Sequence, residues 1–271
     1  YIDIYHGASY FKRWNRTREV SGGLSIHKGT HHFDLVNWLI GQRARKVHAF
    51  GARNYFGPDG EFNPSRKDGR VCETCEEKTQ CKYFMRWSSR TETNLPPDDH
   101  LNILGVPNRA KQYSNYRPDH CIFDSEINIE DTYVVNILYD QGAMLSYSEH
   151  FSAPYEGYRL AINGTRGRIE TQEWHAPPRT PFPTPENQTI DYFPIFGSKE
   201  TIYTVPSVGG HGGGDPLILE DIFMGPDPQR GYDIQAGALD AAYAVCIGEA
   251  VWKSAKTGEV IDLEDLLGEY K

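Results

Sequence analysis

The chain has 271 residues and a formal net charge of −9, from 37 acidic and 28 basic side chains. This charge would repel nucleic acid and anionic membrane surfaces, and a mean hydropathy of −0.60 without a long apolar run excludes a membrane span. The partner we expect is therefore a small neutral or cationic molecule.

The chain opens with alternating apolar and polar residues from Tyr1 to Tyr5, a pattern typical of a β-strand. No signal or transit segment is evident at its start. We therefore expect that the chain begins inside a fold, that the true N-terminus is missing, and that the protein is cytoplasmic.

Apolar residues at helical spacing then predict a helix over residues 25–40, ending near Gly41. A β-rich run predicts a strand over residues 46–55. Residues 56–120 are polar, rich in proline and aspartate, and hold three of the five cysteines. We interpret this stretch as an insertion in the domain.

From Asp131 onward, short β-rich runs are separated by turn residues such as Asp140-Gln141-Gly142. Strands are predicted over residues 132–138, 143–150, 158–163, 168–171, 201–205 and 260–263, and helices over residues 209–223 and 233–255. The pattern predicts one α+β domain spanning residues 1–271, with a largely antiparallel open sheet covered by helices on one face.

Three segments resemble the family of glucose-fructose oxidoreductase, inositol dehydrogenase and MocA-like proteins: Gly22-Gly23-Leu24-Ser25-Ile26-His27-Lys28-Gly29-Thr30-His31-His32-Phe33-Asp34, Asn163 to Glu170, and Lys253 to Val260. The resemblance implies two domains in the complete protein: a Rossmann domain that binds NAD or NADP, and a C-terminal dihydrodipicolinate-reductase-like domain that contacts substrate. We expect only the second in this chain, because a dinucleotide fingerprint and the family's Glu-Lys-Pro motif are absent. The chain alone is then expected to be inactive.

The His-rich segment of the predicted helix is the candidate catalytic group. His27 and His31 lie one helical turn apart, with Lys28 on the adjoining face, and His31 matches the family's catalytic histidine by resemblance. A histidine suits the removal of a hydroxyl proton during hydride transfer, Lys28 could assist it, and His27 stands where many relatives carry an acid. Two alternatives remain: side chains that only pack or face water, and a zinc site on His27 and His31.

Four further residues are candidate substrate contacts: His6, Arg13, Trp14 and His211. The first three combine cations with an aromatic ring, as carbohydrate clefts do, and glycines around His211 would let the backbone approach a ligand. An ordinary loop with a buried Trp14, and a helix-entry loop capped by Asp215, explain the same residues.

The cysteines form a second pattern, with Cys72, Cys75, Cys81 and Cys121 in or beside the polar insertion. Four thiols would satisfy a structural zinc ion or an iron–sulfur cluster, while disulfides or free thiols are the alternatives. Cys246, in an alanine-rich apolar helix, is expected in the core.

The favoured function is NAD(P)-dependent oxidation or reduction of a sugar, glycoside or cyclitol. One rival is a glycosidase of the same family that oxidises the sugar transiently, eliminates the glycosidic bond and returns the hydride. Another is a non-catalytic module that forms homo-oligomers through an open sheet face with Tyr133, Val135, Ile137, Leu145 and Tyr147.

Overall fold

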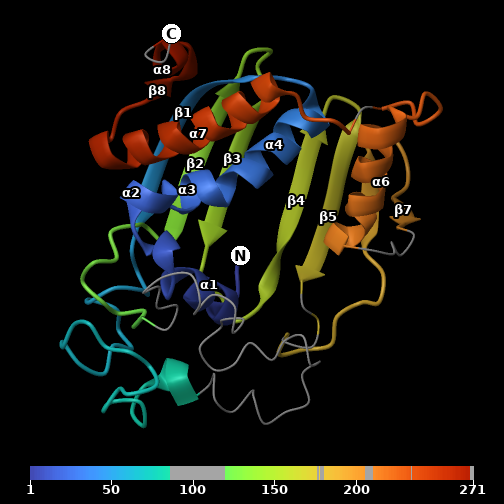
Figure 1. The fold of residues 1–271 in the computed structure, drawn as a ribbon. Coiled ribbons are helices and arrows are strands. Elements are labelled where there is room, and N and C mark those ends of the chain that lie inside the picture. Colours follow the sequence, from blue (N-terminus) through green and yellow to red (C-terminus); the bar gives the residue numbers. More distant parts are fainter. Residues whose placement is uncertain (86–119, 176, 178–179, 205–209, 233, 269–271) are drawn as a thin grey trace. The chain divides into compact units, whose positions relative to one another are not determined.

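The computed structural model describes residues 1–85, 120–175, 177, 180–204, 210–232 and 234–268, without the side chains of residues 5 and 210–212. The chain divides into two compact units, Tyr1–Pro154 with Ala242–Lys271, and Tyr155–Ala241 (Figure 1). Among the described helices, none has the length and apolar composition needed to cross a lipid bilayer.

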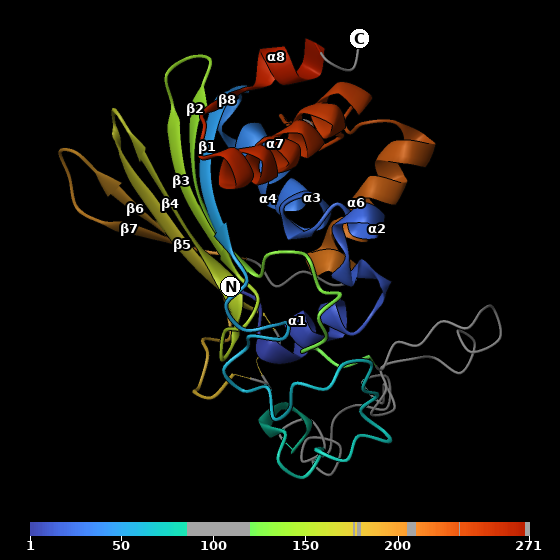
Figure 2. The ribbon, with the colours of Figure 1, turned by 90° about the vertical axis from the view of Figure 1, so that its left-hand side faces the viewer.

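The first unit contains a four-stranded antiparallel sheet in the order β3-β2-β1-β8. Its strands are β1 (Ala44–Ala52), β2 (Thr132–Tyr139), β3 (Met144–His150) and β8 (Ile261–Asp262). Helices α3 (Leu24–His27), α4 (Gly29–Ile40) and α7 (Ala238–Thr257) lie on one face of this sheet (Figure 2). The α+β class predicted from the sequence is therefore confirmed.

Buried and exposed residues alternate along β2 and show which face of the sheet is covered. Tyr133, Val135 and Ile137 are each at most 2% exposed and belong to the core, where Leu145 and Tyr147 pack against them. The prediction that these five residues form an open face is wrong, because the apolar face of the sheet lies beneath the helices of its own chain. The other face exposes Phe50, Val134, Leu138 and Met144.

The start of the chain differs from the predicted strand. Residues 2 to 4 run beside the end of β3, where the Ile2 amide donates to the His150 carbonyl oxygen at 2.7 Å, but helix α1 (Ile4–Phe11) then begins at once. The buried Asp3 carboxylate accepts the His6 amide at 3.0 Å, satisfying a donor of the first helical turn. A short 3₁₀ helix η1 (Trp14–Arg16) and α2 (Arg18–Ser21) follow.

The predicted helix over residues 25–40 is two helices that meet at Lys28. Lys28 ends α3, begins α4, and has a φ of −113°. The break coincides with Gly29, and glycine destabilises a helix because it loses more conformational entropy there than other residues do. Gly22 and Gly23 precede α3 with φ values of 73° and 79°, a left-handed conformation that other residues adopt at a cost. The double glycine therefore sets the direction in which α3 enters the fold.

Helix α7 packs closely against α3. A Cβ atom at Gly248 would lie only 2.4 Å from the Ser25 carbonyl oxygen. Arg18 adds a tie, because its guanidinium bonds to the Gly22 carbonyl and to the Glu249 carboxylate, at 2.6 and 2.7 Å, and lies over the Trp252 ring. The packing of α7 against α3 thus fixes the position of the His-rich segment.

The described parts of the predicted insertion are mostly turns, and buried carboxylates hold them in place. Asp131, fully buried, accepts the backbone amides of Asn54, Tyr55 and Phe56, which supports the chain where it leaves β1. At the other end of the chain, α8 (Leu263–Gly268) follows β8 and was not predicted.

The second unit contains the antiparallel sheet β4-β5-β6-β7 and helix α6. The strands are β4 (Glu156–Gly164), β5 (Gly167–His175), β6 (Thr189–Pro194) and β7 (Glu200–Tyr203), and α6 spans Gly210–Met224. Strand β6 was not predicted, and the predicted strand over residues 201–205 is β7. The predicted antiparallel strands thus form two sheets.

Candidate active site

His27 ends α3 and is held from several sides. Its Nδ1 lies 3.0 Å from the Tyr10 hydroxyl and 3.3 Å from the Asn15 amide nitrogen, and the Trp14 ring stacks on the imidazole with centroids 6.1 Å apart. Because an amide nitrogen only donates, Nδ1 accepts, and a neutral His27 carries its hydrogen on Nε2. The ring is thereby fixed in one orientation and one tautomer.

The three predicted catalytic residues influence one another electrostatically. Burial lowers the pKa of His27, and the positive charges of Lys28 and His31 lower it further. His31 is exposed on the first turn of α4, while His27 and Lys28 are partly buried. The arrangement favours a neutral His27 beside an accessible His31.

A buried acid lies on the sheet beneath these helices. Glu149 of β3 has a side chain only 3% exposed, with Oε1 4.0 Å from His32 Nδ1, and the same nitrogen lies 2.7 Å from the Tyr147 hydroxyl. Burial raises the pKa of Glu149 to about 8, although Tyr147 and Lys28 oppose the shift. A carboxyl group whose pKa is near neutral pH therefore lies beside His32.

Sequence reasoning did not find Tyr10, Asn15, Tyr147 or Glu149 as part of this site. One signal was present in the sequence for Glu149, because it takes an inward position in β3, two residues after Tyr147. An acid in a core-facing register is unusual and points to a polar partner.

The predicted substrate residues differ in whether the structure shows them in contact with this site. Trp14, 50% exposed, contacts His27 directly, so it is not the buried loop residue of the alternative interpretation. His6 lies one helical turn before Tyr10 on α1, and Arg13 immediately precedes η1. His211 is in the first turn of α6, and its side chain lies outside the described residues.

The cysteines are all free thiols, so the disulfide alternative is not borne out. Cys121 is buried, whereas Cys72, Cys75 and Cys81 are partly buried. As predicted, Cys246 belongs to the core.

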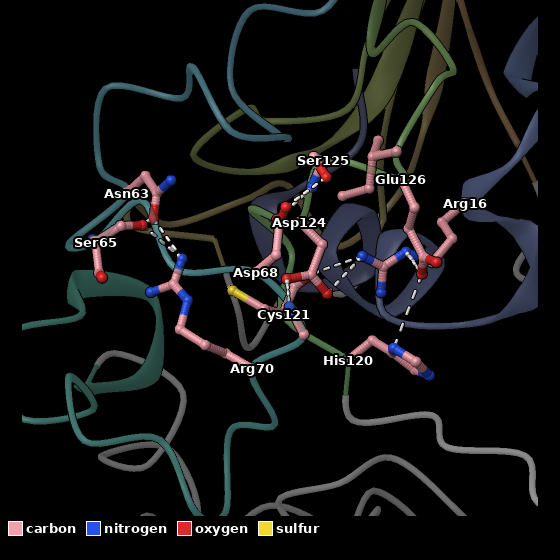
Figure 3. A network of polar contacts seen from close by, with 12 residues as sticks. Arg16, Asn63, Ser65, Asp68, Arg70, His120, Cys121, Asp124, Ser125 and Glu126 are labelled. Carbon is pink, nitrogen blue, oxygen red and sulfur yellow. Dashed lines mark hydrogen bonds and ion pairs between the residues drawn. The ribbon is translucent and has the colours of Figure 1, made fainter.

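Arg16 is the centre of a polar network close to Cys121 (Figure 3). It forms ion pairs of 2.9 Å with Asp124 and with Glu126, and donates to the Cys121 carbonyl oxygen at 2.9 Å. His120 lies 3.8 Å from Glu126. The network joins η1 to the end of the predicted insertion.

Comparison with known sequences identifies a family and a relative. The family described as "Oxidoreductase family, C-terminal alpha/beta domain" matches residues 1–263. YteT of Bacillus subtilis (strain 168), which is named as an oxidoreductase, is 58% identical over 267 residues, or 98% of this chain and 61% of that protein. The chain thus spans less than two thirds of this relative.

Solved structures are similar to this chain at low sequence identity. An NADPH-dependent oxidoreductase from Desulfitobacterium hafniense superimposes with a TM-score of 0.51 at 11% identity, over 94% of this chain and 52% of that one. Aldose-aldose oxidoreductase from Caulobacter crescentus, complexed with glycerol, gives a TM-score of 0.49 at 14% identity, over 93% and 51%. The likeness to the Desulfitobacterium hafniense structure concerns the fold alone.

Proposed function

Because this chain belongs to the oxidoreductase family whose C-terminal α/β domain matches residues 1–263, we propose that it forms the substrate-binding side of an NAD(P)-dependent enzyme. The substrate would be a sugar, glycoside or cyclitol, oxidised or reduced at a hydroxyl group. The observation that carries this proposal is the grouping of His27, Lys28 and His31 on one short segment, in which burial, and then the neighbouring Lys28 and His31, lower the pKa of His27.

His31 is the general base of the proposed reaction. It is exposed, so a substrate hydroxyl can reach its imidazole, and it would take the hydroxyl proton as the hydride leaves. Lys28 would donate a hydrogen bond to the same oxygen and stabilise negative charge that develops there. His27 is fixed through Nδ1 by Tyr10 and Asn15, so its Nε2–H is free to orient the substrate.

Trp14 would provide the platform for the substrate. A half-exposed indole beside His27 suits stacking on the apolar face of a sugar ring. His6 and Arg13 are proposed to bind its hydroxyl groups.

We propose that the described residues do not themselves form the dinucleotide site. Neighbouring strands in both sheets are antiparallel, whereas such sites follow a strand of a parallel sheet. We therefore assign NAD or NADP to a separate nucleotide-binding domain of the complete protein, where the nicotinamide supplies the hydride acceptor or donor. In this scheme the present chain supplies only proton transfer and substrate binding, and is inactive alone.

Turnover by the complete protein tests the proposal. Sugars and glycosides are offered with NAD or NADP, while NAD(P)H absorbance and product release are followed together. We expect His31→Ala to lower kcat by about 100-fold to 10,000-fold, the usual contribution of a general base. His48→Ala, on the sheet face opposite the helices, is the matched control and should keep full activity.

The outcomes separate the rival functions. Product with stoichiometric NAD(P)H supports the dehydrogenase, whereas product without net NAD(P)H indicates the glycosidase that oxidises, eliminates and returns the hydride. Unchanged turnover in His31→Ala would refute the site assignment. No product across the panel would favour a non-catalytic binding module.

The exposed sheet face is our proposed surface for homo-oligomers, in place of the buried face. Phe50 lies opposite Val134, and Leu138 opposite Met144, in the strand register, so these apolar side chains form two pairs on the exposed face of β1, β2 and β3. Val134→Glu should shift the protein to a smaller species in sedimentation. An unchanged sedimentation coefficient would remove this face from consideration.

A further inference from the structure

The short helix η1 carries two of the residues that contact His27. Trp14 stacks on the His27 imidazole, with ring centroids 6.1 Å apart, and the Asn15 amide nitrogen lies 3.3 Å from His27 Nδ1. Asn15 is buried, whereas Trp14 is half exposed. The position of η1 therefore decides whether the proposed sugar platform and the amide that fixes the His27 tautomer are both in place.

The backbone of η1 does little to fix its own position. The bond that closes this turn runs from the Arg16 amide to the Arg13 carbonyl oxygen at 3.2 Å, and a helical turn of three residues is marginally stable by itself. Contacts from other parts of the chain must therefore hold it. The Ser21 hydroxyl donates to the Asn15 carbonyl oxygen at 2.7 Å, and the Arg16 side chain provides further contacts.

Arg16 ties η1 to a segment that is far away in the sequence. Its Nη2 donates to the Asp124 carboxylate and to the Cys121 carbonyl oxygen, each at 2.9 Å, and its Nε forms an ion pair of 2.9 Å with Glu126 (Figure 3). A guanidinium is planar and rigid, so contacts in several directions fix its orientation as well as its place. The tie is therefore directional.

The inner ion pair is buried on both sides. The side chains of Arg16 and Asp124 are 3% and 5% exposed. Removing a charge from water costs free energy that its partner must offset, and replacing such pairs by apolar side chains often leaves a protein as stable as before. The pair thus contributes little net stability, but it tolerates few arrangements of its two partners. This favours a role for Arg16 in setting the position of η1.

The partners of Arg16 are themselves anchored. The Asp124 carboxylate also accepts the Gly69 amide at 3.1 Å. Asp68 accepts the Ser125 amide at 2.8 Å and the Ser125 hydroxyl at 2.6 Å. Arg16 is thus attached to a framework made from the predicted insertion and the segment that follows it.

The acids around Arg16 are poorly arranged for a metal ion. His120, Asp124 and Glu126 offer ligand atoms within 4.8 Å of one another. The Arg16 guanidinium, however, lies 2.9 Å from a carboxylate oxygen of each acid, so it would repel a metal cation and compete for the same oxygens. Arg16 is therefore the cation that this cluster binds.

We propose that Arg16 is a positioning residue for the active site proposed above, on which this inference rests: it holds Trp14 and Asn15 against His27 at a place set by the predicted insertion. The insertion carries none of the proposed catalytic groups, yet in this way it determines how well the substrate is bound. Arg16 acts on η1, whereas His31 belongs to α4, and Tyr10 also holds His27. Loss of the tie should therefore weaken substrate binding more than the chemical step.

Steady-state kinetics of the complete protein test the proposal. Arg16→Lys keeps the charge but loses the planar fork, and we expect KM for the sugar substrate to rise about 3-fold to 10-fold, the range for a lost aromatic contact. The value of kcat should stay within about twofold. Glu126→Gln, which leaves the buried pair intact, should raise KM in the same direction by a smaller factor.

Glu76→Gln is the matched control for Glu126→Gln. Glu76 forms an ion pair of 3.0 Å with Lys67 elsewhere in the predicted insertion, so the same substitution there should leave KM unchanged. An equal rise in KM in both variants would overturn the proposal.

A combined variant shows whether Arg16 acts through Trp14. If it does, Arg16→Lys should raise KM no further in a chain that already carries Trp14→Ala. Fully additive increases in KM would overturn the proposal, as would a fall in kcat with KM unchanged.

A spectroscopic measurement does not depend on turnover. The ring current of Trp14 shifts the NMR signals of the His27 imidazole, which are assigned by their loss in His27→Gln. In Arg16→Lys these signals should move towards their positions in Trp14→Ala, and in Glu76→Gln they should stay.

Glu126→Gln keeps the buried pair and therefore provides the NMR comparison if Arg16→Lys does not fold. Unmoved His27 signals would overturn the role of Arg16 even where turnover supports His31 as the base. Absence of turnover in the parent protein would instead refute the proposed function, and the movement of the His27 signals would then decide on Arg16 alone.

Discussion

Replacing Gly248 by alanine tests how closely the helices behind the proposed active site are packed. The added Cβ would lie 2.4 Å from the Ser25 carbonyl oxygen and 3.0 Å from the Ile26 Cα atom. Both contacts are with backbone, so no side-chain rotation can relieve them. Contacts below 3.0 Å are essentially never seen at a real Cβ, and α3 must therefore move away from α7.

Two opposing terms set the expected size of the effect. Overpacking of this kind costs about 1–3 kcal/mol, whereas alanine is favoured over glycine inside a helix by about 1 kcal/mol. We expect a net loss of up to about 2 kcal/mol in the free energy of unfolding. In the complete protein, turnover should fall as well, because His27 ends the displaced helix.

Urea unfolding followed by circular dichroism is the assay, with Gly214→Ala as control. Gly214 is in α6, and a Cβ atom there would have no neighbour within 4 Å, so this variant should gain up to about 1 kcal/mol from helix propensity alone. If Gly248→Ala were stabilised as much as the control, the close contact between α3 and α7 would be refuted.

Three further changes have defined outcomes. Asp131→Ala removes the acceptor of three backbone amides from a fully buried position and should cost about 3–5 kcal/mol in urea unfolding; a loss below 1 kcal/mol would contradict this role. Glu156 and then Glu173 raise the pKa of His175 to about 9, so the stabilisation is complete below its ordinary pKa of about 6.5 and lost as the pH rises through 9. In His175→Gln the urea midpoint should no longer fall as the pH rises through 9. If the fall persisted, a different titrating group would be its cause. Burial raises the pKa of Glu149 to about 8, so stability falls as the pH rises from about 4.5 to 8 and the carboxyl group ionises. Glu149→Gln should therefore unfold at a higher urea concentration than the parent at pH 9 but not at pH 4. Equal urea midpoints at both pH values would argue against a buried ionisable carboxyl group.

Predictions from local signals succeeded where neighbouring residues settle the structure. The turn Asp140-Gln141-Gly142 joins β2 and β3 as expected, because a glycine with a φ of 90° permits the reversal. By contrast, alternation from Tyr1 to Tyr5 predicted a strand where α1 begins at Ile4. A five-residue apolar alternation does not decide between strand and helix, and the carboxylate of Asp3 favoured the helix.

The candidate site shows the same division. The sequence by itself determined the family resemblance and the proximity of His27, Lys28 and His31, because residues at most four apart in the chain lie close together even where α3 ends and α4 begins. Only the tertiary structure decided that His27 contacts Tyr10, that His32 contacts Tyr147 across a separation of 115 residues, and which face of the sheet is buried. Such contacts depend on the packing of α1, α4 and β3, and residues far apart in sequence carry no local pattern that records which of them will meet.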